Sequence, residues 1–138
     1  MKKVKVVYYS NTGNTEAMAN AIMSGLKDGC EAELIPFSDF TVDMAEDCDV
    51  IIFGCPACGS EELDESYVEP FFSSNIDKLS SKNVALFGSY GWGGGEWLET
   101  WKSRLQKANV NVVDTIMCEQ TPDDSALQEC VEFGKKLI

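Results

Sequence analysis

The chain has 138 residues, of which 44% are hydrophobic and 25% are charged, a composition typical of a globular protein with a single hydrophobic core. Its 23 acidic residues outnumber the 11 basic ones, and the net charge is −12. This charge argues against nucleic acids and anionic membranes as partners, because both attract positive surfaces. It favours encounters with basic proteins. We expect one domain over residues 1–138 and a monomer.

The N-terminus resembles a targeting signal only superficially. Lys2 and Lys3 precede an apolar run, but that run is too short for a signal peptide and no cleavage pattern follows it. No apolar run approaches the length of a membrane span. We therefore expect a cytoplasmic protein whose six cysteines are free thiols: Cys30, Cys48, Cys55, Cys58, Cys118 and Cys130.

A strand and the loop after it open the chain. The β-branched and aromatic residues at 4–9 predict a buried strand, and the polar run Ser10-Asn11-Thr12-Gly13-Asn14-Thr15 predicts a turn into a helix. Hydroxyls and free backbone N–H groups at a helix start can hold an anion. Because the loop lacks both the Lys of a Walker A motif and the glycines of a dinucleotide fingerprint, it fits one phosphate monoester. Taken alone, it could equally be a helix cap at Thr12 or Asn14.

The rest of the chain alternates between strands and helices. Further strands are predicted at residues 32–37, 49–54, 84–88 and 110–118, and the run at 49–54 is apolar on both faces, as in a central parallel strand. Helical spacing marks residues 15–26, residues 67–79 with Pro70 in the first turn, the segment containing Trp97 and Trp101, and the C-terminus. This order predicts an α/β fold, a doubly wound five-stranded parallel sheet with helices on both faces. Ligands of such sheets bind beyond the carboxyl ends of the strands.

Three motifs follow strands one, three and four: Ser10 to Thr15, Cys58-Gly59-Ser60-Glu61, and Ser89-Tyr90-Gly91-Trp92-Gly93. On these motifs the chain resembles short-chain flavodoxins of the clostridial type over essentially its whole length. The resemblance implies the strand order 2-1-3-4-5, which the general rule for this sheet takes from flavodoxin itself. It also implies a non-covalently bound FMN and one-electron transfer between proteins, in place of ferredoxin-type carriers. Such a carrier is not an enzyme.

The resemblance also gives each loop a role. The first loop would hold the phosphate, residues near Ser89 and Gln120 would approach the ribityl chain, and Trp92 would stack on the outer face of the ring. Trp97 and Trp101 would instead pack on the next helix. Glu61 would accept a hydrogen bond from the flavin N3–H. The expected cofactor-binding residues are Ser10, Asn11, Thr12, Gly13, Asn14, Thr15, Pro56, Ala57, Cys58, Gly59, Ser60, Glu61, Ser89, Tyr90, Gly91, Trp92, Gly93 and Gln120.

Gly59 matches the family position whose peptide turns over on flavin reduction and offers its carbonyl to N5–H. Glycine suits that position, because it moves between negative and positive φ at little cost. The carbonyl would stabilise the neutral semiquinone, and nearby carboxylates would disfavour the anionic hydroquinone. The protein would then work between these two states at low potential. Those acids are Glu61, Glu62, Asp64, Glu65 and Glu69, which taken alone are typical of a solvated surface.

Rival interpretations start from Cys55-Pro56-Ala57-Cys58, a Cys-x-x-Cys motif found in thiol-disulfide oxidoreductases. In those enzymes the motif begins a helix, whereas here Glu61 and Glu62 surround it with negative charge, which would raise a thiol pKa. Zinc is less favoured, because one cysteine pair without any His lacks ligands. A small FMN-dependent reductase is a further alternative, although no general acid stands near the loops.

Two residues depart from the clostridial pattern. Cys58 stands where that type has Met against the inner face of the ring, and Pro56 stands where relatives can carry a hydroxyl near the phosphate. A thiol is small and often buried, so we expect Cys58 to be neutral and unreactive beside the flavin. Burial and the nearby carboxylates should both raise its pKa.

Overall fold

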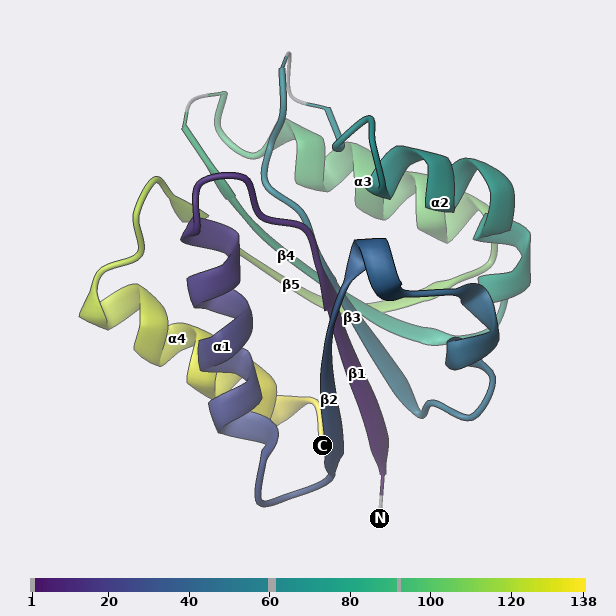
Figure 1. The fold of residues 1–138 in the computed structure, drawn as a ribbon, viewed down its shortest axis with the longest axis horizontal. Helices are drawn as coiled ribbons and strands as arrows, with labels where there is room; N and C mark the ends of the chain where they lie inside the picture. The colour runs from purple at the N-terminus through teal and green to yellow at the C-terminus, as the bar shows by residue number, and fades with distance from the viewer. Residues whose placement is uncertain (1, 60–61, 92) are drawn as a thin grey trace.

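The computed structural model describes residues 2–59, 62–91 and 93–138. The strands are β1 (Lys3–Tyr8), β2 (Glu31–Pro36), β3 (Val50–Gly54), β4 (Asn83–Tyr90) and β5 (Asn111–Glu119). The α-helices are α1 (Asn14–Leu26), α2 (Val68–Asn75), α3 (Glu96–Lys107) and α4 (Asp124–Lys136), and short 3-10 helices are η1 (Phe37–Asp39), η2 (Val42–Ala45) and η3 (Ile76–Leu79). All strand pairs are parallel, in the order β2-β1-β3-β4-β5 (Figure 1). The predicted fold class and strand order are confirmed.

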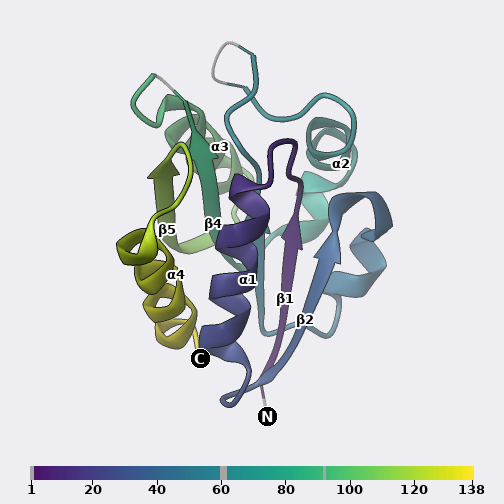
Figure 2. The same cartoon turned by 60° about the vertical axis from the view of Figure 1, so that its left-hand side comes forward.

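The helices cover the sheet in two pairs, α1 with α4 on one face and α2 with α3 on the other (Figure 2). Every residue of β3 is buried, because this central strand is covered on both faces. An aromatic cluster fills the α2 side, where the rings of Phe53 and Phe72 lie 5.1 Å apart. Met18, Ile22 and Phe87 are among the residues that fill the other side. Within the described ranges, no helix has the length and apolar character that a membrane crossing requires.

Three predicted boundaries differ from the structure. The fourth strand extends to Tyr90, so that Ser89 and Tyr90, predicted in a loop, pair with Cys118 and Glu119 of β5. The connection at residues 38–48, for which no helix or strand was predicted, forms most of η1 and all of η2, and buries Phe40 in the core. The helix predicted over 67–79 ends at Asn75 and continues as η3. Pro70 lies in its first turn, as predicted.

Two glycines allow α1 and α4 to pack with their backbones in close contact. A Cβ atom added at Gly25 would overlap the carbonyl oxygen of Val131, and one added at Gly134 would overlap the carbonyl oxygen of Ile22. Glycine inside a helix costs about 0.5–1 kcal/mol relative to alanine. The close contact between these two helices therefore comes at the expense of their intrinsic stability.

Candidate functional site

Loops from four strands meet at the carboxyl end of the sheet, the upper end in Figure 2. They enclose a hollow of about 360 Å³. Its lining residues are Asn11, Thr12, Asn14, Pro56, Ala57, Ser89, Tyr90, Gly91, Gln120 and Thr121. All of them except Thr121 belong to the set predicted to bind a cofactor. Sequence reasoning missed Thr121, although its position next to Gln120 at the exit of β5 was a usable signal.

The loop after β1 is held in shape by its own serine. Ser10 Oγ accepts hydrogen bonds from the backbone N–H groups of Gly13 (3.1 Å) and Glu16 (3.2 Å). Because a hydroxyl has two acceptor lone pairs and one hydrogen, the Ser10 O–H remains able to donate to a ligand. Gly13 is the N-cap of α1, with φ +92°, and the hydroxyl that accepts from the first turn of this helix belongs to Ser10, not to Thr12 or Asn14. The alternative of a cap at Thr12 or Asn14 is therefore wrong.

The same loop offers several neutral donors at the positive end of α1. Within the part of the chain that the structure describes, the backbone N–H groups of Asn11, Thr12, Asn14 and Thr15 have no acceptor. The first N–H groups of a helix have no intrahelical partner, and the helix dipole is positive at this end. These donors fit the oxygens of one phosphate monoester. The phosphate end of FMN therefore matches the chemistry of this loop.

Hydrogen bonds within the protein connect the loops to one another. The hydroxyls of Thr15 and Ser89 lie 2.8 Å apart, and both residues are almost fully buried. The backbone of Ala57 donates to the Ser89 carbonyl (2.9 Å), and that of Gln120 donates to the Tyr90 carbonyl (2.7 Å). Pairing between neighbouring strands thus continues into the loops that line the hollow.

Cys58 and Glu62 close the segment that contains Gly59. Their backbones exchange two hydrogen bonds of 2.8 Å in an isolated antiparallel bridge. Gly59 has φ +52°, and a Cβ at this position would meet no atom within 4 Å. Backbone conformation, rather than space, therefore favours glycine here. The predicted residues Ser60, Glu61 and Trp92 lie outside the described residues.

The remaining predicted residues lie around the hollow without lining it. Ser10 and Gly13 line a neighbouring hollow of about 290 Å³, together with Tyr9 and Tyr67. Thr15, Cys58, Gly59 and Gly93 line neither of these hollows. Trp97 and Trp101 are buried, as predicted, and the Trp97 indole N–H donates to the carbonyl of Cys55 (3.1 Å).

The acidic residues after β3 are not all solvated. Asp64 is only 5% exposed, and its carboxylate accepts from the backbone N–H groups of Tyr67 (2.6 Å) and Val68 (3.1 Å) at the start of α2. Glu69 forms a two-pronged ion pair with Arg104 of α3, with both N–O distances 2.8 Å. The Arg104 hydrogen bond lowers the pKa of Glu69 below its usual value. Of the described acids in this segment, Glu62 and Glu65 match the expectation of exposure.

The two cysteines of the Cys-x-x-Cys motif lie beside the site in different environments. Cys55 follows β3 and is fully buried, whereas Cys58 is half-buried. Burial raises the pKa of the Cys55 thiol well above its usual value. A hydrogen bond from Cys55 lowers the pKa of the Cys58 thiol, although burial and the Asp64 and Glu65 carboxylates oppose this shift. The expected upward shift at Cys58 is therefore wrong, because the neighbouring thiol stabilises the thiolate more than these groups destabilise it.

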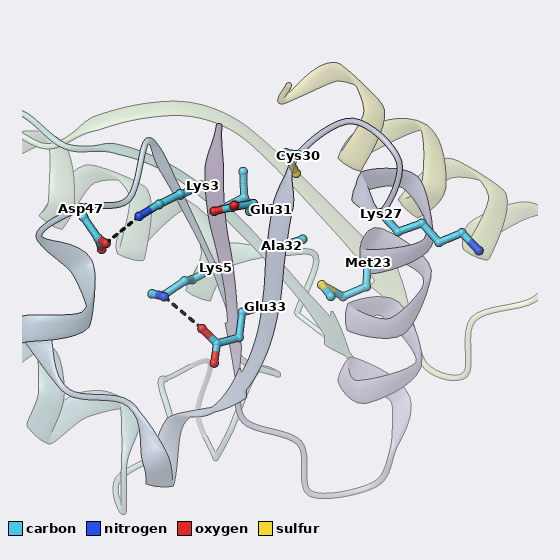
Figure 3. A pocket seen from close by; sticks show the side chains of 10 residues that line it. Lys3, Lys5, Met23, Lys27, Cys30, Glu31, Ala32, Glu33 and Asp47 are labelled. Carbon is cyan, nitrogen blue, oxygen red and sulfur yellow. Dashed lines mark hydrogen bonds and ion pairs between the residues drawn. The ribbon is translucent and has the colours of Figure 1, made fainter. Parts of the chain in front are cut away.

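A separate hollow of about 500 Å³ lies at the opposite end of the sheet. There Lys3 points to Asp47 at 3.2 Å and Lys5 points to Glu33 at 3.0 Å (Figure 3). Each of these two lysines already has an acidic partner, and the amino ends of parallel strands are not where ligands of such sheets bind. The loops at the carboxyl ends remain the candidate site.

Comparison with known proteins identifies the family. The family model for flavodoxin matches residues 6–134. The chain belongs to the flavodoxin family. It is 49% identical to the flavodoxin of Megasphaera elsdenii, with 96% of each chain covered, and 44% identical to that of Clostridium beijerinckii, with 97% of this chain and 98% of the relative covered. The solution structure of two-electron reduced Megasphaera elsdenii flavodoxin superposes with a TM-score of 0.87, at 47% identity, covering 96% of this chain and 98% of that one.

These matches confirm the predicted resemblance to short-chain flavodoxins. The flavodoxin family binds FMN, and its members are low-potential electron carriers rather than enzymes. This flavodoxin therefore has other redox proteins as its partners. The thiol-disulfide oxidoreductase and the small FMN-dependent reductase are not supported as its main function. Consistent with this, Cys55 follows a strand in this flavodoxin, and the next α-helix begins only at Val68.

Proposed function

We propose that residues 1–138 act as one domain that holds a single FMN at the carboxyl ends of β1, β3, β4 and β5. The phosphate would lie on the loop from Ser10 to Thr15, and the ribityl chain would lie in the hollow near Ser89 and Gln120. The ring would lie between the segment from Cys58 to Glu61 and the loop from Gly91 to Gly93, with Trp92 on its outer face. The four free N–H groups of the phosphate loop are the observation that carries this proposal.

The charges around the site support a low potential for the second electron. Among the described residues, no Lys or Arg lines either hollow at this end of the sheet. Negative charge that develops on the bound flavin would lie beside the segment that carries the exposed acids Glu62 and Glu65, with no Lys or Arg among the described residues that line these hollows. We propose that this environment makes the anionic reduced state costly, so that the carrier works between its one-electron and two-electron reduced forms.

The partners that fit this surface are basic redox proteins. The net charge is −12, and Glu62 and Glu65 are exposed on the segment beside the site. Complementary charge speeds the encounter of two proteins more than it tightens the final complex. All six cysteines are free, which fits the reducing cytoplasm that we propose as its location.

The phosphate site can be tested by comparing FMN with riboflavin, which lacks the phosphate. We expect the apoprotein to bind FMN much more tightly, measured by quenching of flavin fluorescence. Thr12→Ala should weaken FMN binding by about 1.5–3 kcal/mol, the range for a hydrogen bond to a charged group, and should leave riboflavin binding unchanged. Thr12 is a cleaner target than Ser10, because the Ser10 oxygen also stabilises its own loop.

Thr100→Ala provides the matched control, since Thr100 is exposed on α3, away from both hollows. Binding of both flavins should be unchanged in this variant. Equal affinities of the wild-type protein for FMN and riboflavin would contradict the proposed phosphate site.

A further inference from the structure

We propose that Cys55 and Cys58 form a thiol-disulfide exchange site that reacts with low-molecular-weight disulfides. This site is distinct from electron transfer by the flavin. It is accessible when the flavin is absent and covered when the flavin is bound.

The two thiols share one hydrogen-bond acceptor. The Cys55 thiol donates to the carbonyl oxygen of Pro56 (3.3 Å), and the Cys58 thiol donates to the same oxygen (3.5 Å). Cys30, Cys48 and Cys118 donate to three different carbonyl groups and share no acceptor. The backbone bridge between Cys58 and Glu62 and the hydrogen bond from Cys55 N–H to the Phe87 carbonyl hold both residues in place.

The two cysteines differ in the way that such a pair requires. Cys58 is half-buried and can meet a small molecule, whereas Cys55 is fully buried and cannot. When Cys58 loses its proton, the Cys55 thiol can turn from the Pro56 oxygen and donate to the thiolate, which lowers the pKa of Cys58. Since the thiolate is the attacking form, Cys58 is the nucleophile and Cys55 the resolving thiol.

Two displacements complete the reaction. The Cys58 thiolate attacks one sulfur of the small disulfide, its S–S bond breaks, and one small thiolate leaves and takes up the proton lost by Cys58. The Cys55 thiol then gives up its proton and attacks Cys58 Sγ, and the second small thiolate leaves with that proton. Two protein thiols are oxidised to one disulfide, and one small disulfide is reduced to two small thiols.

The test uses oxidised glutathione on the full chain after removal of FMN, with circular dichroism to show that it is folded. Modified cysteines are located by mass spectrometry over time. Cys118 is the internal control, because it is also half-buried but burial raises its pKa. A lower pKa increases the thiolate fraction more than it reduces nucleophilicity, so Cys58 should react faster than Cys118, by about threefold for each unit by which its pKa is lower.

Two variants separate the steps. Cys55→Ser should stop the reaction at a glutathione adduct on Cys58, whereas the wild type should proceed to a Cys55–Cys58 disulfide. Cys48→Ser removes another buried thiol and should behave as the wild type. Reaction of Cys58 no faster than that of Cys118, or a stable adduct on Cys58 in the wild type, would overturn the proposal.

The effect of FMN is a separate arm that rests on the proposed function. Bound FMN should slow modification of Cys58 at least about tenfold, the factor that an added barrier of 1.36 kcal/mol gives, and should leave Cys118 unchanged. Fast exchange that FMN does not slow would overturn the placement of this pair beneath the flavin, while the exchange reaction itself would stand. Failure to bind FMN at all would instead count against the proposed function.

Discussion

Gly59 has a left-handed backbone, and no atom of the described residues lies within 4 Å of the position of an added Cβ, so within the protein a side chain there is opposed by φ and not by crowding. A residue with a Cβ pays about 1–2 kcal/mol in this conformation. We expect Gly59→Val to lower the fraction of one-electron-reduced protein at half reduction, because the peptide that should turn over toward the flavin becomes more costly to place. A spectroscopic redox titration measures this fraction.

Gly94 provides the matched control for this substitution. It has φ +74° and equally open space, but it lies outside the set of residues proposed to bind FMN. Gly94→Val should therefore cost stability without changing the half-reduced fraction. A wild-type fraction in Gly59→Val, or an equal loss in both variants, would show that the Gly59 peptide has no specific role.

The ion pair between Glu69 and Arg104 joins two helices on one face of the sheet, α2 and α3. The ion pair lowers the pKa of Glu69 in the folded protein below its usual value of 4.5. The pair therefore stabilises the fold fully at pH values above 4.5, and this stabilisation is lost as the pH falls through the lowered pKa. We expect Glu69→Gln to reduce the free energy of unfolding at pH 7 by at most about 1 kcal/mol, because the pair is partly exposed. Urea denaturation at pH 7 and at pH 3 measures the difference.

At pH 3 the wild type and Glu69→Gln should be closer in stability than at pH 7. Glu99→Gln is the matched control, since Glu99 is exposed on α3 and has no ion-pair partner among the described residues. Its unfolding free energy should follow that of the wild type at both pH values. A difference for Glu69→Gln that is the same at both pH values would exclude the ion pair as its cause.

The charge of the whole molecule should control the rate at which it meets a basic partner. We expect the double variant Glu62→Gln with Glu65→Gln to slow electron transfer to a basic haem protein. It should also make the two-electron-reduced state of the flavin easier to form. Stopped-flow mixing measures the rate, and the rate effect should fade with salt, because the Debye length is about 10 Å at 0.1 M. Asp28→Asn with Glu31→Gln removes the same charge at the far end of the sheet.

This far-end double variant changes the net charge by the same amount. It should leave the reduction potential of the flavin unaltered and the rate of electron transfer almost unaltered. Equal slowing by the two double variants would mean that only net charge matters. If neither the rate nor the potential changes in Glu62→Gln with Glu65→Gln, these acids are ordinary solvated surface.

The parts of the molecule that sequence could predict are those set by local chemistry. Residue type and hydrophobic period predicted the first strand, the turn at Ser10 to Thr15, the buried run of β3 and the loops at the carboxyl ends of the strands. Asp64 was not predictable in the same way, because a carboxylate among other acids gives no sign that it will be buried as a cap. The lowered pKa of Cys58 likewise depends on where Cys55 points, which only the folded chain shows.

The close contact of α1 with α4 has a consequence for the site. The first of these helices begins at the phosphate loop, and the second begins just after Gln120 and Thr121, so each is the continuation of one wall of the hollow. The spacing of the two helices is limited by Gly25 and Gly134, which lie near the helix ends farther from the hollow. A methyl group at either glycine would push the two helices apart, and their displacement would change the shape of the hollow at their other ends. With FMN in this hollow, as proposed, a substitution at either position would act on a cofactor that neither glycine contacts.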